Sequence, residues 1–323
     1  IWMVVRHGTR LPSSKDIIGM NTTLRALKYD ILMHHKYGQI ALTEEEIERL
    51  EDWNPNIEVE KEKYLTLEGR DEMILLAERM QKRFPNAIMK KYSNESFLVS
   101  IFGRQLLLLH GIKQSHFPLS VPFYLIKVII IYITEKVELM YKICGYETSW
   151  NKHFPSPWCG AFDKESAEVL EYYFDLKTYW LDGYGHDLTY RQACMLLKHM
   201  FESFNKTTGP KASFLFSHSG TMLKIISHLG LYKPDTHLRA DNMDAKREWK
   251  ASDIDCFASN LAFVLMDCKD GPHILSLHQE RIIKMPMCDS ELCPYTNFTE
   301  HFKDSILNCD FKDMCSLEKN ETD

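Results

Sequence analysis

Short apolar runs and amphipathic stretches alternate along most of the chain. Four apolar runs predict buried strands, at residues 1–5, 212–217, 261–266 and 273–277. Apolar residues that recur near the helical period predict helices over residues 66–84, 163–180, 190–204 and 221–229. Pro85 and Gly230 mark the ends of two of these helices. Strands that alternate with helices indicate an α/β core, and the helix-rich middle indicates an inserted α-helical subdomain.

The segment from residue 97 to residue 140 does not fit this pattern well. Its part at 117–134, FPLSVPFYLIKVIIIYIT, is strongly apolar but carries two prolines and Lys127. A transmembrane helix needs about 20 mainly apolar residues with few charges, so this stretch is marginal. Three interpretations stay open: a buried strand or helix, a membrane span, and a stretch that is not native to the fold.

Composition narrows the class of partner. The chain has 323 residues, of which 45% are hydrophobic and 26% charged, as in ordinary globular proteins. The formal net charge of −6 disfavours nucleic-acid binding, which rewards an excess of Lys and Arg. We expect no nucleic-acid partner and a monomer, and an anionic substrate would need a local basic site.

Cysteines and N-glycosylation sequons indicate the cellular compartment of the protein. The chain has nine cysteines without a CxxC pair or paired His/Cys spacing, so we expect no metal and no other cofactor. Cys288 lies near Cys293 and Cys309 near Cys315, which suits disulfides in a secreted protein, although buried thiols in a cytosolic enzyme are an alternative. Five asparagines stand in N-x-[ST] sequons: Asn21, Asn94, Asn205, Asn297 and Asn320. These features favour a glycoprotein of the secretory pathway, in the ER lumen or outside the cell.

The chain opens with IWMVVRHG, without an initiator Met or a signal peptide. We interpret it as a fragment or as a processed form whose leader has been removed.

The first candidate site follows the first predicted strand directly. Arg6, His7, Gly8, Thr9 and Arg10 stand where ligands bind in open α/β sheets. Arginine offers a charged planar fork that matches phosphate oxygens, and an imidazole nitrogen is a competent nucleophile for phosphoryl transfer. Glycine lets backbone N–H groups approach an anion closely. The alternative is a surface loop with three incidental cations.

His218 occupies an equivalent place after a second predicted strand and before a predicted helix. The N-terminus of a helix attracts anions through its unpaired N–H groups and its dipole. Two histidines at strand ends, His7 and His218, are therefore expected to face one phosphate group. A histidine with a purely structural role at a strand end is the alternative for His218.

Together these motifs resemble the histidine acid phosphatase superfamily, in the branch with an RHG strand end and a distant second histidine. Among its members, the multiple inositol polyphosphate phosphatases are most similar. The resemblance covers about residues 1–90 and 140–315 and rests on five segments: RHGTRLP (6–12), LTLEGRDEM (65–73), FPSPWCGAFDKESAEVLEYYFDLKTYWLDGYG (154–185), SHSGT (217–221) and KREWKASDIDCFASNLAFVLMDC (246–268).

The resemblance implies a fold and an activity. It implies an α/β fold with a mostly parallel central sheet flanked by helices. The expected core is residues 1–20, 62–110 and 208–285, with a helical subdomain at 21–61 and 111–207 and a cysteine-bearing tail at 286–323. The implied activity is a metal-independent phosphomonoesterase that acts through a phosphohistidine on inositol hexakisphosphate and related polyphosphates, or on 2,3-bisphosphoglycerate.

The resemblance also implies roles for individual residues. His7 would attack the phosphorus and His218 would help to hold the same phosphoryl group. Arg6, Arg10 and Thr9 would bind the substrate.

Two departures from the family pattern put full activity in doubt. The second histidine of the family is followed by Ala-Glu or by Asp, whose carboxyl protonates the leaving oxygen, whereas His218 is followed by Ser219 and Gly220. Arg104 is the only arginine in the region where the family has a further phosphate-binding arginine, and its context does not match. A weakened or inactive relative that binds phosphorylated ligands is therefore the alternative function. A serine hydrolase with Ser219 as nucleophile is a third, but SHSGT lacks the first glycine of G-x-S-x-G.

Overall fold

The structure is a computed structural model of the chain. It describes residues 1–40, 42–89, 93, 97–101, 121–206, 208–310 and 314, and for 101 and 121–133 it describes the backbone alone.

The chain divides into two compact units. The sheet unit comprises Ile1–His7, Met73–His110 and Tyr172–Asp323, and the helical unit comprises Gly8–Glu72 and Gly111–Glu171. The RHGTR motif is thus shared between the units, because the boundary falls between His7 and Gly8.

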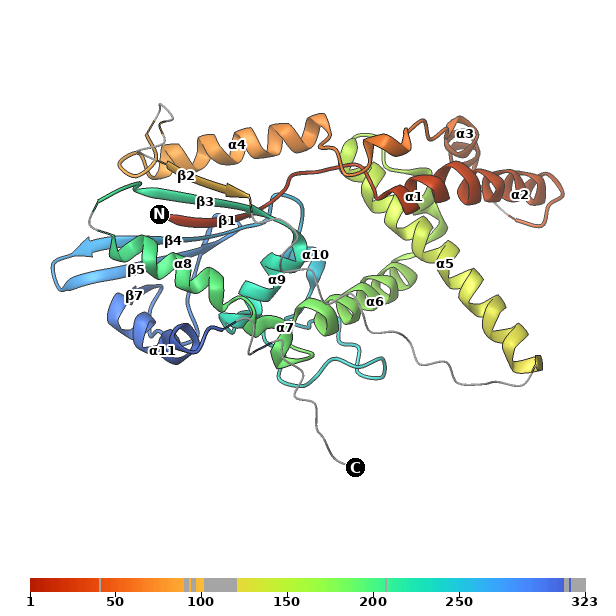
Figure 1. Cartoon of the computed structure of the whole chain (residues 1–323). Helices are drawn as coiled ribbons and strands as arrows, with labels where there is room; N and C mark the ends of the chain where they lie inside the picture. Colours follow the sequence, from red (N-terminus) through yellow and green to blue (C-terminus); the bar gives the residue numbers. More distant parts are fainter. Residues whose placement is uncertain are drawn as a thin grey trace. The chain divides into compact units, whose positions relative to one another are not determined.

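The described residues of the sheet unit contain a seven-stranded sheet in the order β2-β3-β1-β4-β5-β6, with β7 also paired to β5 (Figure 1). Its strands are β1 (Trp2–Arg6), β2 (Phe97–Ile101), β3 (Ala212–Ser217), β4 (Asn260–Cys268), β5 (Gly271–His278), β6 (Arg281–Ile283) and β7 (Leu292–Pro294). The helices with residues in this unit are α4 (Leu67–Arg83), α6 (Lys164–Asp182), α7 (Asp187–Arg191), α8 (Cys194–Asn205), α9 (Ser219–His228), α10 (Ala251–Ile254) and α11 (Tyr295–Leu307). The α/β class with flanking helices is confirmed.

The sheet is mixed, and the expectation of a mostly parallel sheet was wrong for the described strands. Strand β3 pairs in parallel with β1 and β2, whereas β1–β4, β4–β5, β5–β6 and β5–β7 are antiparallel. For the β4–β5 and β5–β6 pairs the reason is the two-residue connection, since so short a loop can join antiparallel neighbours only, and a parallel crossover needs a dozen residues or more.

Strand β1 is buried on both faces, which explains why its sequence is continuously apolar. Trp2 and Val4 pack with buried residues of α8, α9 and α11. Met3 and Val5 pack on the opposite face with Leu76 of α4. Figure 1 shows the same arrangement, with α4 on one side of the sheet and α8 and α11 on the other.

The observed units differ from the expected domains in four places. Residues 8–20 and 62–72, which were expected in the core, lie in the helical unit. Residues 172–207 belong to the sheet unit, because Leu196, Leu197 and Met200 of α8 are part of its core. The expected tail also adds strand β7 to the sheet and buries Phe298 in the same core. The predicted helix over 190–204 is in fact two helices, α7 and α8, which a short turn separates. The residue types at this turn are compatible with a helix, so the sequence pattern does not reveal it.

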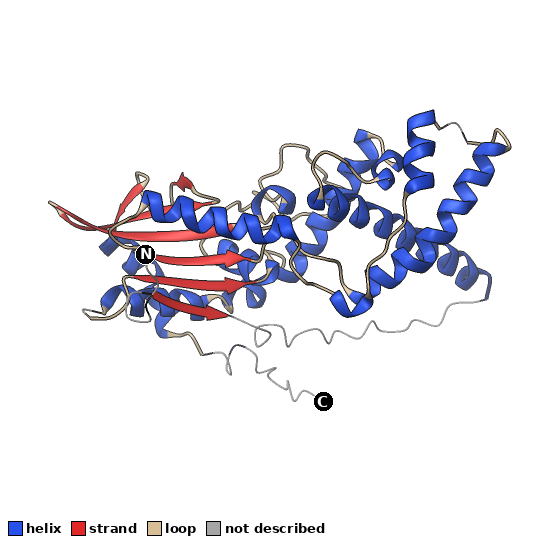
Figure 2. Cartoon of the chain, turned by 90° about the horizontal axis from the view of Figure 1, so that it is seen from above, coloured by secondary structure: helices blue, strands red, loops and turns tan. Residues whose placement is uncertain are grey.

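The described part of the helical unit consists of helices and loops (Figure 2). It also contains an isolated bridge between Arg10 and Leu65. Its elements are α1 (Ser14–Gly19), the π-helix η1 (Met20–Leu24), α2 (Arg25–Lys36), α3 (Glu44–Asp52), the 3₁₀ turn η2 (Val59–Lys61), α5 (Val121–Trp150) and the 3₁₀ turn η4 (Pro157–Ala161). Helix α3 has the acidic sequence EEEIERLED, and Thr43 and Glu46 form a capping box at its start.

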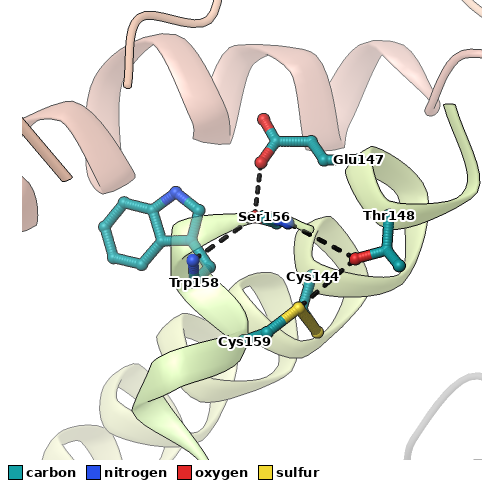
Figure 3. The surroundings of a disulfide bond; sticks show 6 residues. All are labelled: Cys144, Glu147, Thr148, Ser156, Trp158 and Cys159. Atoms are coloured by element: carbon teal, nitrogen blue, oxygen red, sulfur yellow. Dashed lines mark hydrogen bonds between the residues drawn. A yellow bond between two sulfur atoms is a disulfide. The ribbon is translucent and has the colours of Figure 1, made fainter. Parts of the chain in front are cut away.

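A disulfide between Cys144 and Cys159 ties α5 to η4 in the core of the helical unit (Figure 3). Beside it, the carboxylate of Glu147 accepts hydrogen bonds from Ser156 Oγ and from Trp53 Nε1, the latter at 2.8 Å. Burial raises the pKa of Glu147 above its usual range, although both hydrogen bonds act against the rise.

Two further disulfides lie in the sheet unit. Cys288 pairs with Cys293, its near neighbour, whereas Cys309 pairs with Cys194 across 115 residues. The second pairing depends on α8 and α11 lying side by side, which spacing along the chain does not reveal. Cys315 lies outside the described residues.

The unusual segment at 97–140 contains strand β2 and the first part of α5. Residues 102–120, with Arg104 among them, lie outside the described residues, as does the start of the 117–134 stretch. No helix in the described part of the chain is both long and apolar enough to span a membrane.

Candidate active site

The two histidines meet at one edge of the sheet. Strands β1 and β3 are parallel, with Arg6 in register with Ser217, so His7 and His218 leave the sheet together. The His7 N–H donates to Ser217 O at 3.2 Å, and the centroids of the two imidazole rings lie 5.5 Å apart at an interplanar angle of 62°. His7 is half-buried and His218 exposed. The spacing is small enough for both rings to contact one phosphoryl group.

A loop between α10 and β4 packs against the His7 turn. The Ala258 N–H donates to His7 O at 3.1 Å, and the Arg6 N–H donates to Ser259 O at 2.8 Å. The ring of Phe257 lies 5.8 Å from the His7 ring and 4.8 Å from the guanidinium carbon of Arg6. Ala258 has φ = 59°, a left-handed conformation that costs a non-glycine residue about 1 kcal/mol or more. These contacts orient the His7 turn through the backbone.

The guanidinium of Arg6 is paired with a buried carboxyl that the sequence motifs did not indicate. Its Nη1 lies 3.3 Å from Asp255 Oδ2 and also donates to the main-chain oxygen of Asp255. The side chain of Asp255 is 2% exposed, and Ser219 Oγ donates a hydrogen bond to its Oδ2. Burial raises the pKa of Asp255 to about 6, against the opposing charge of Arg6 and the hydrogen bond from Ser219.

Helix α9 begins directly after His218, which is its N-cap. The free N–H groups of its first turn follow His218 directly along the chain, and they favour an anion there. At Gly220 in this turn a Cβ would lie 2.9 Å from Asp182 Oδ1, so a larger residue there would require this side chain to shift. Asp182 is in turn paired with Lys224 Nζ at 3.1 Å. The helix thus adds backbone donors, and a half-buried ion pair lies beside them.

Thr9 and Arg10 belong to the helical unit and are described there. Thr9 is 1% exposed, and both its N–H and its hydroxyl donate to the carboxylate of Glu72, at 2.7 and 3.0 Å. This arrangement gives Thr9 a structural task. Gly8 has one as well, because a Cβ there would lie 2.2 Å from Gly69 O; backbone packing, rather than approach to an anion, explains this glycine.

Arg10 is held loosely for a half-buried arginine. Its Nη1 donates to the neighbouring Leu11 O at 3.1 Å, and its buried Nε has no hydrogen-bond partner in the described part of the chain. Such a guanidinium retains donors for a ligand.

Arg10→Ala is therefore expected to raise KM for a phosphate ester by about tenfold, the effect of losing one charge-assisted hydrogen bond. Its thermal midpoint should change little, because one local hydrogen bond is lost. Steady-state kinetics and a melting curve measure both. An unfolded variant would instead show that Arg10 is structural.

A grouping of potential metal ligands in the described part of the chain lies away from this edge of the sheet. Cys268, Asp270 and His273 come together on the β4–β5 hairpin. The histidine edge itself brings together His7, His218 and Arg6, with Asp255 behind them.

The chain is similar to histidine phosphatases and to inositol polyphosphate phosphatases. Residues 134–285 match the model of the histidine phosphatase superfamily (branch 2). A multiple inositol polyphosphate phosphatase 1 of Drosophila melanogaster is 27% identical over 94% of this chain and 78% of its own length. That of Gallus gallus is 31% identical over 57% of this chain, and the match spans 44% of its length. The phytase of D. castellii shares the fold, with a TM-score of 0.72 at 14% identity over 97% of this chain and 80% of that chain.

Proposed function

We propose that the chain is a member of the histidine phosphatase superfamily (branch 2), whose model it matches over residues 134–285, and that it is a phosphomonoesterase that acts on inositol polyphosphates through a phosphohistidine. The observation that supports this most directly is the pair of strand-end histidines, His7 and His218, with ring centroids 5.5 Å apart. The named relatives are inositol polyphosphate phosphatases, which supplies the class of substrate.

In the proposed reaction a ring nitrogen of His7 attacks the phosphorus. His218, Arg6 and the first N–H groups of α9 hold the equatorial oxygens. Negative charge is spread over these oxygens in a loose transition state, so fixed donors and cations at this edge of the sheet supply much of the catalysis. Arg10 is proposed to bind the same substrate. Water then attacks the phosphohistidine and releases inorganic phosphate.

The proposed substrates are inositol hexakisphosphate and, secondarily, 2,3-bisphosphoglycerate. The alternative is a relative that binds phosphorylated ligands with little turnover. Ser219 and Gly220 favour it, because neither residue after His218 carries an ionisable group. Turnover of an aryl phosphate separates the two, since its leaving group needs little protonation.

A serine hydrolase is disfavoured by the contacts of Ser219. Its hydroxyl donates to the buried carboxyl of Asp255, whereas a nucleophilic serine of this class donates to a histidine that serves as its base.

We place the protein in the secretory pathway, as a monomeric glycoprotein. Three disulfides in the described part of the chain favour an oxidising compartment. Asn205 and Asn297 of the sequons are exposed, whereas Asn21 is half-buried and donates to Ile57 O at 3.2 Å. Asn94 and Asn320 lie outside the described residues.

The test is phosphate release by the purified chain. Inositol hexakisphosphate at micromolar to millimolar concentration should yield inorganic phosphate and lower inositol phosphates, resolved by ion-exchange chromatography. 4-Nitrophenyl phosphate should be hydrolysed at the same site and show competition. Binding of inositol hexakisphosphate in calorimetry, without phosphate release from either ester, would contradict the enzyme and favour the binding protein.

A further inference from the structure

A phosphatase of this kind needs a proton for the leaving oxygen when the ester is an alkyl phosphate. A departing alkoxide is a strong base, and a positioned acid contributes about 10²–10⁴ in rate. The two residues directly after His218 are Ser219 and Gly220, and neither has an ionisable group. The chain therefore needs a proton source from another element.

One carboxyl of the sheet unit reaches this place. Asp255 follows α10, and its Oδ2 accepts a hydrogen bond from Ser219 Oγ, in the residue next to His218. Its other oxygen, Oδ1, is buried and has no hydrogen-bond partner in the described part of the chain. A carboxylate oxygen that is buried without a hydrogen-bond partner costs free energy because its charge is not compensated. Protonation of the carboxyl removes that charge. The contacts thus favour a carboxyl that carries a proton.

The charged neighbours of Asp255 come from three elements. Arg6 at the end of β1 favours the carboxylate, as does the hydroxyl of Ser219 in α9, while Asp182 in α6 favours the protonated form. Lys224 of α9 is engaged by Asp182 at 3.1 Å. Burial outweighs the others and raises the pKa of Asp255 to about 6. The protonated form is therefore abundant in mildly acidic solution, the condition that a general acid needs.

Asp182 of α6 is the weaker candidate among the carboxyls near this place. Its Oδ1 lies 3.1 Å from Lys224 Nζ, whereas it is Asp255 that holds the hydroxyl of Ser219.

We propose that Asp255 is the proton source of this active site and that Ser219 Oγ relays its proton to the leaving oxygen. The inference rests on the proposed function, since it concerns the same reaction at His7. Ser219 is the group that contacts the substrate, and Asp255 acts through it.

The relay balances in both half-reactions. In the first, the bond between a ring nitrogen of His7 and phosphorus forms as the bond between phosphorus and the ester oxygen breaks. That oxygen takes the hydroxyl proton of Ser219, which takes the proton of Asp255 and leaves a carboxylate. In the second, water attacks the phosphohistidine and gives a proton through Ser219 back to Asp255, so that His7 and inorganic phosphate are released.

Asp255→Asn tests the relay, because it keeps the shape of the side chain and removes the exchangeable carboxyl proton. With an alkyl ester such as inositol hexakisphosphate, kcat should fall by about 100-fold or more. With 2,4-dinitrophenyl phosphate, whose leaving group departs as a weak base, it should fall by less than about tenfold. Ser219→Ala should show the same divergence. Asp253→Asn, the matched control on an exposed carboxyl of α10, should leave both rates unchanged.

The pH profile gives an independent readout. In the wild type kcat/KM for the alkyl ester should decline as pH rises through about 6, the pKa of Asp255, since the carboxyl then loses its proton. The decline should be absent in Asp255→Asn.

Equal losses on the two esters would overturn the relay and give Asp255 a structural role. Undiminished hydrolysis of the alkyl ester by either variant would overturn it as well. Failure of the wild type to hydrolyse even 2,4-dinitrophenyl phosphate would instead reject the proposed function, and the relay with it.

Discussion

His7→Ala is expected to lower kcat by about 10⁴-fold or more while the fold is retained, as for loss of a nucleophile elsewhere. Every proposed step passes through a bond between this imidazole and phosphorus, so no other part of the site can compensate. The turn itself should persist, because it is held by main-chain bonds from His7 N to Ser217 O and from Ala258 N to His7 O. Neither bond involves the side chain.

The measurement is hydrolysis of 4-nitrophenyl phosphate together with a melting curve. In the wild type, rapid quenching in alkali with a ³²P-labelled ester should also trap an acid-labile phosphohistidine that His7→Ala lacks. His301→Ala, at an exposed histidine of α11, is the control and should behave as the wild type. Substantial turnover by a well-folded His7→Ala protein would place the nucleophile elsewhere.

The sequence predicted the histidine edge well because the determining pattern is local. An apolar run that ends at Arg6 and another that ends before His218 each indicate a buried strand. Parallel pairing of β1 and β3 then brings the two strand ends to the same edge of the sheet. The expected meeting of the rings thus needed the two strand-end patterns and the assumption that these strands are parallel and share one edge of the sheet.

Asp255 could not be found in this way. It stands in a charged stretch, KREWKASDIDC, whose composition is typical of exposed loops. Its burial depends on packing between β1, α6, α9 and the turn at α10, which come from distant parts of the sequence. The pairing of Cys194 with Cys309 was missed for the same reason. One feature of the sequence did point to it. No acidic residue directly follows His218, so the proton donor has to come from another element.

A second large effect is expected at the buried ion pair of Asp175 and Arg247, which is not part of the histidine edge. Asp175 in α6 is 1% exposed and Arg247 3% exposed. Asp175 Oδ2 accepts from Arg247 Nε at 2.7 Å and also from Nη2, while Oδ1 accepts from the Ala251 N–H at 2.7 Å. Asp175→Ala leaves a buried guanidinium uncompensated, so the free energy of unfolding should fall by about 3–5 kcal/mol.

Urea denaturation of the purified chain measures this loss. The double variant Asp175→Leu/Arg247→Met should lose less than Asp175→Ala, because replacing both charges by apolar groups leaves none unpaired. Asp241→Ala is the matched control: it breaks the exposed pair of Arg239 and Asp241 and should change stability by less than about 1 kcal/mol. A loss of that small size for Asp175→Ala would contradict the assigned role of the pair.

This pair also connects core stability to the active site. Asp175 accepts a hydrogen bond from the N–H of Ala251, the first residue of α10. The carbonyl of Ala251 in turn accepts a hydrogen bond from the Asp255 N–H at 2.9 Å. Asp175 thus fixes the turn from which the Asp255 carboxyl reaches Ser219. Asp175→Asn keeps an oxygen for the Ala251 N–H but loses the charge opposite Arg247. It should therefore affect the free energy of unfolding more strongly than kcat. Asp175→Ala should weaken both, because the turn at α10 then loses its anchor as well.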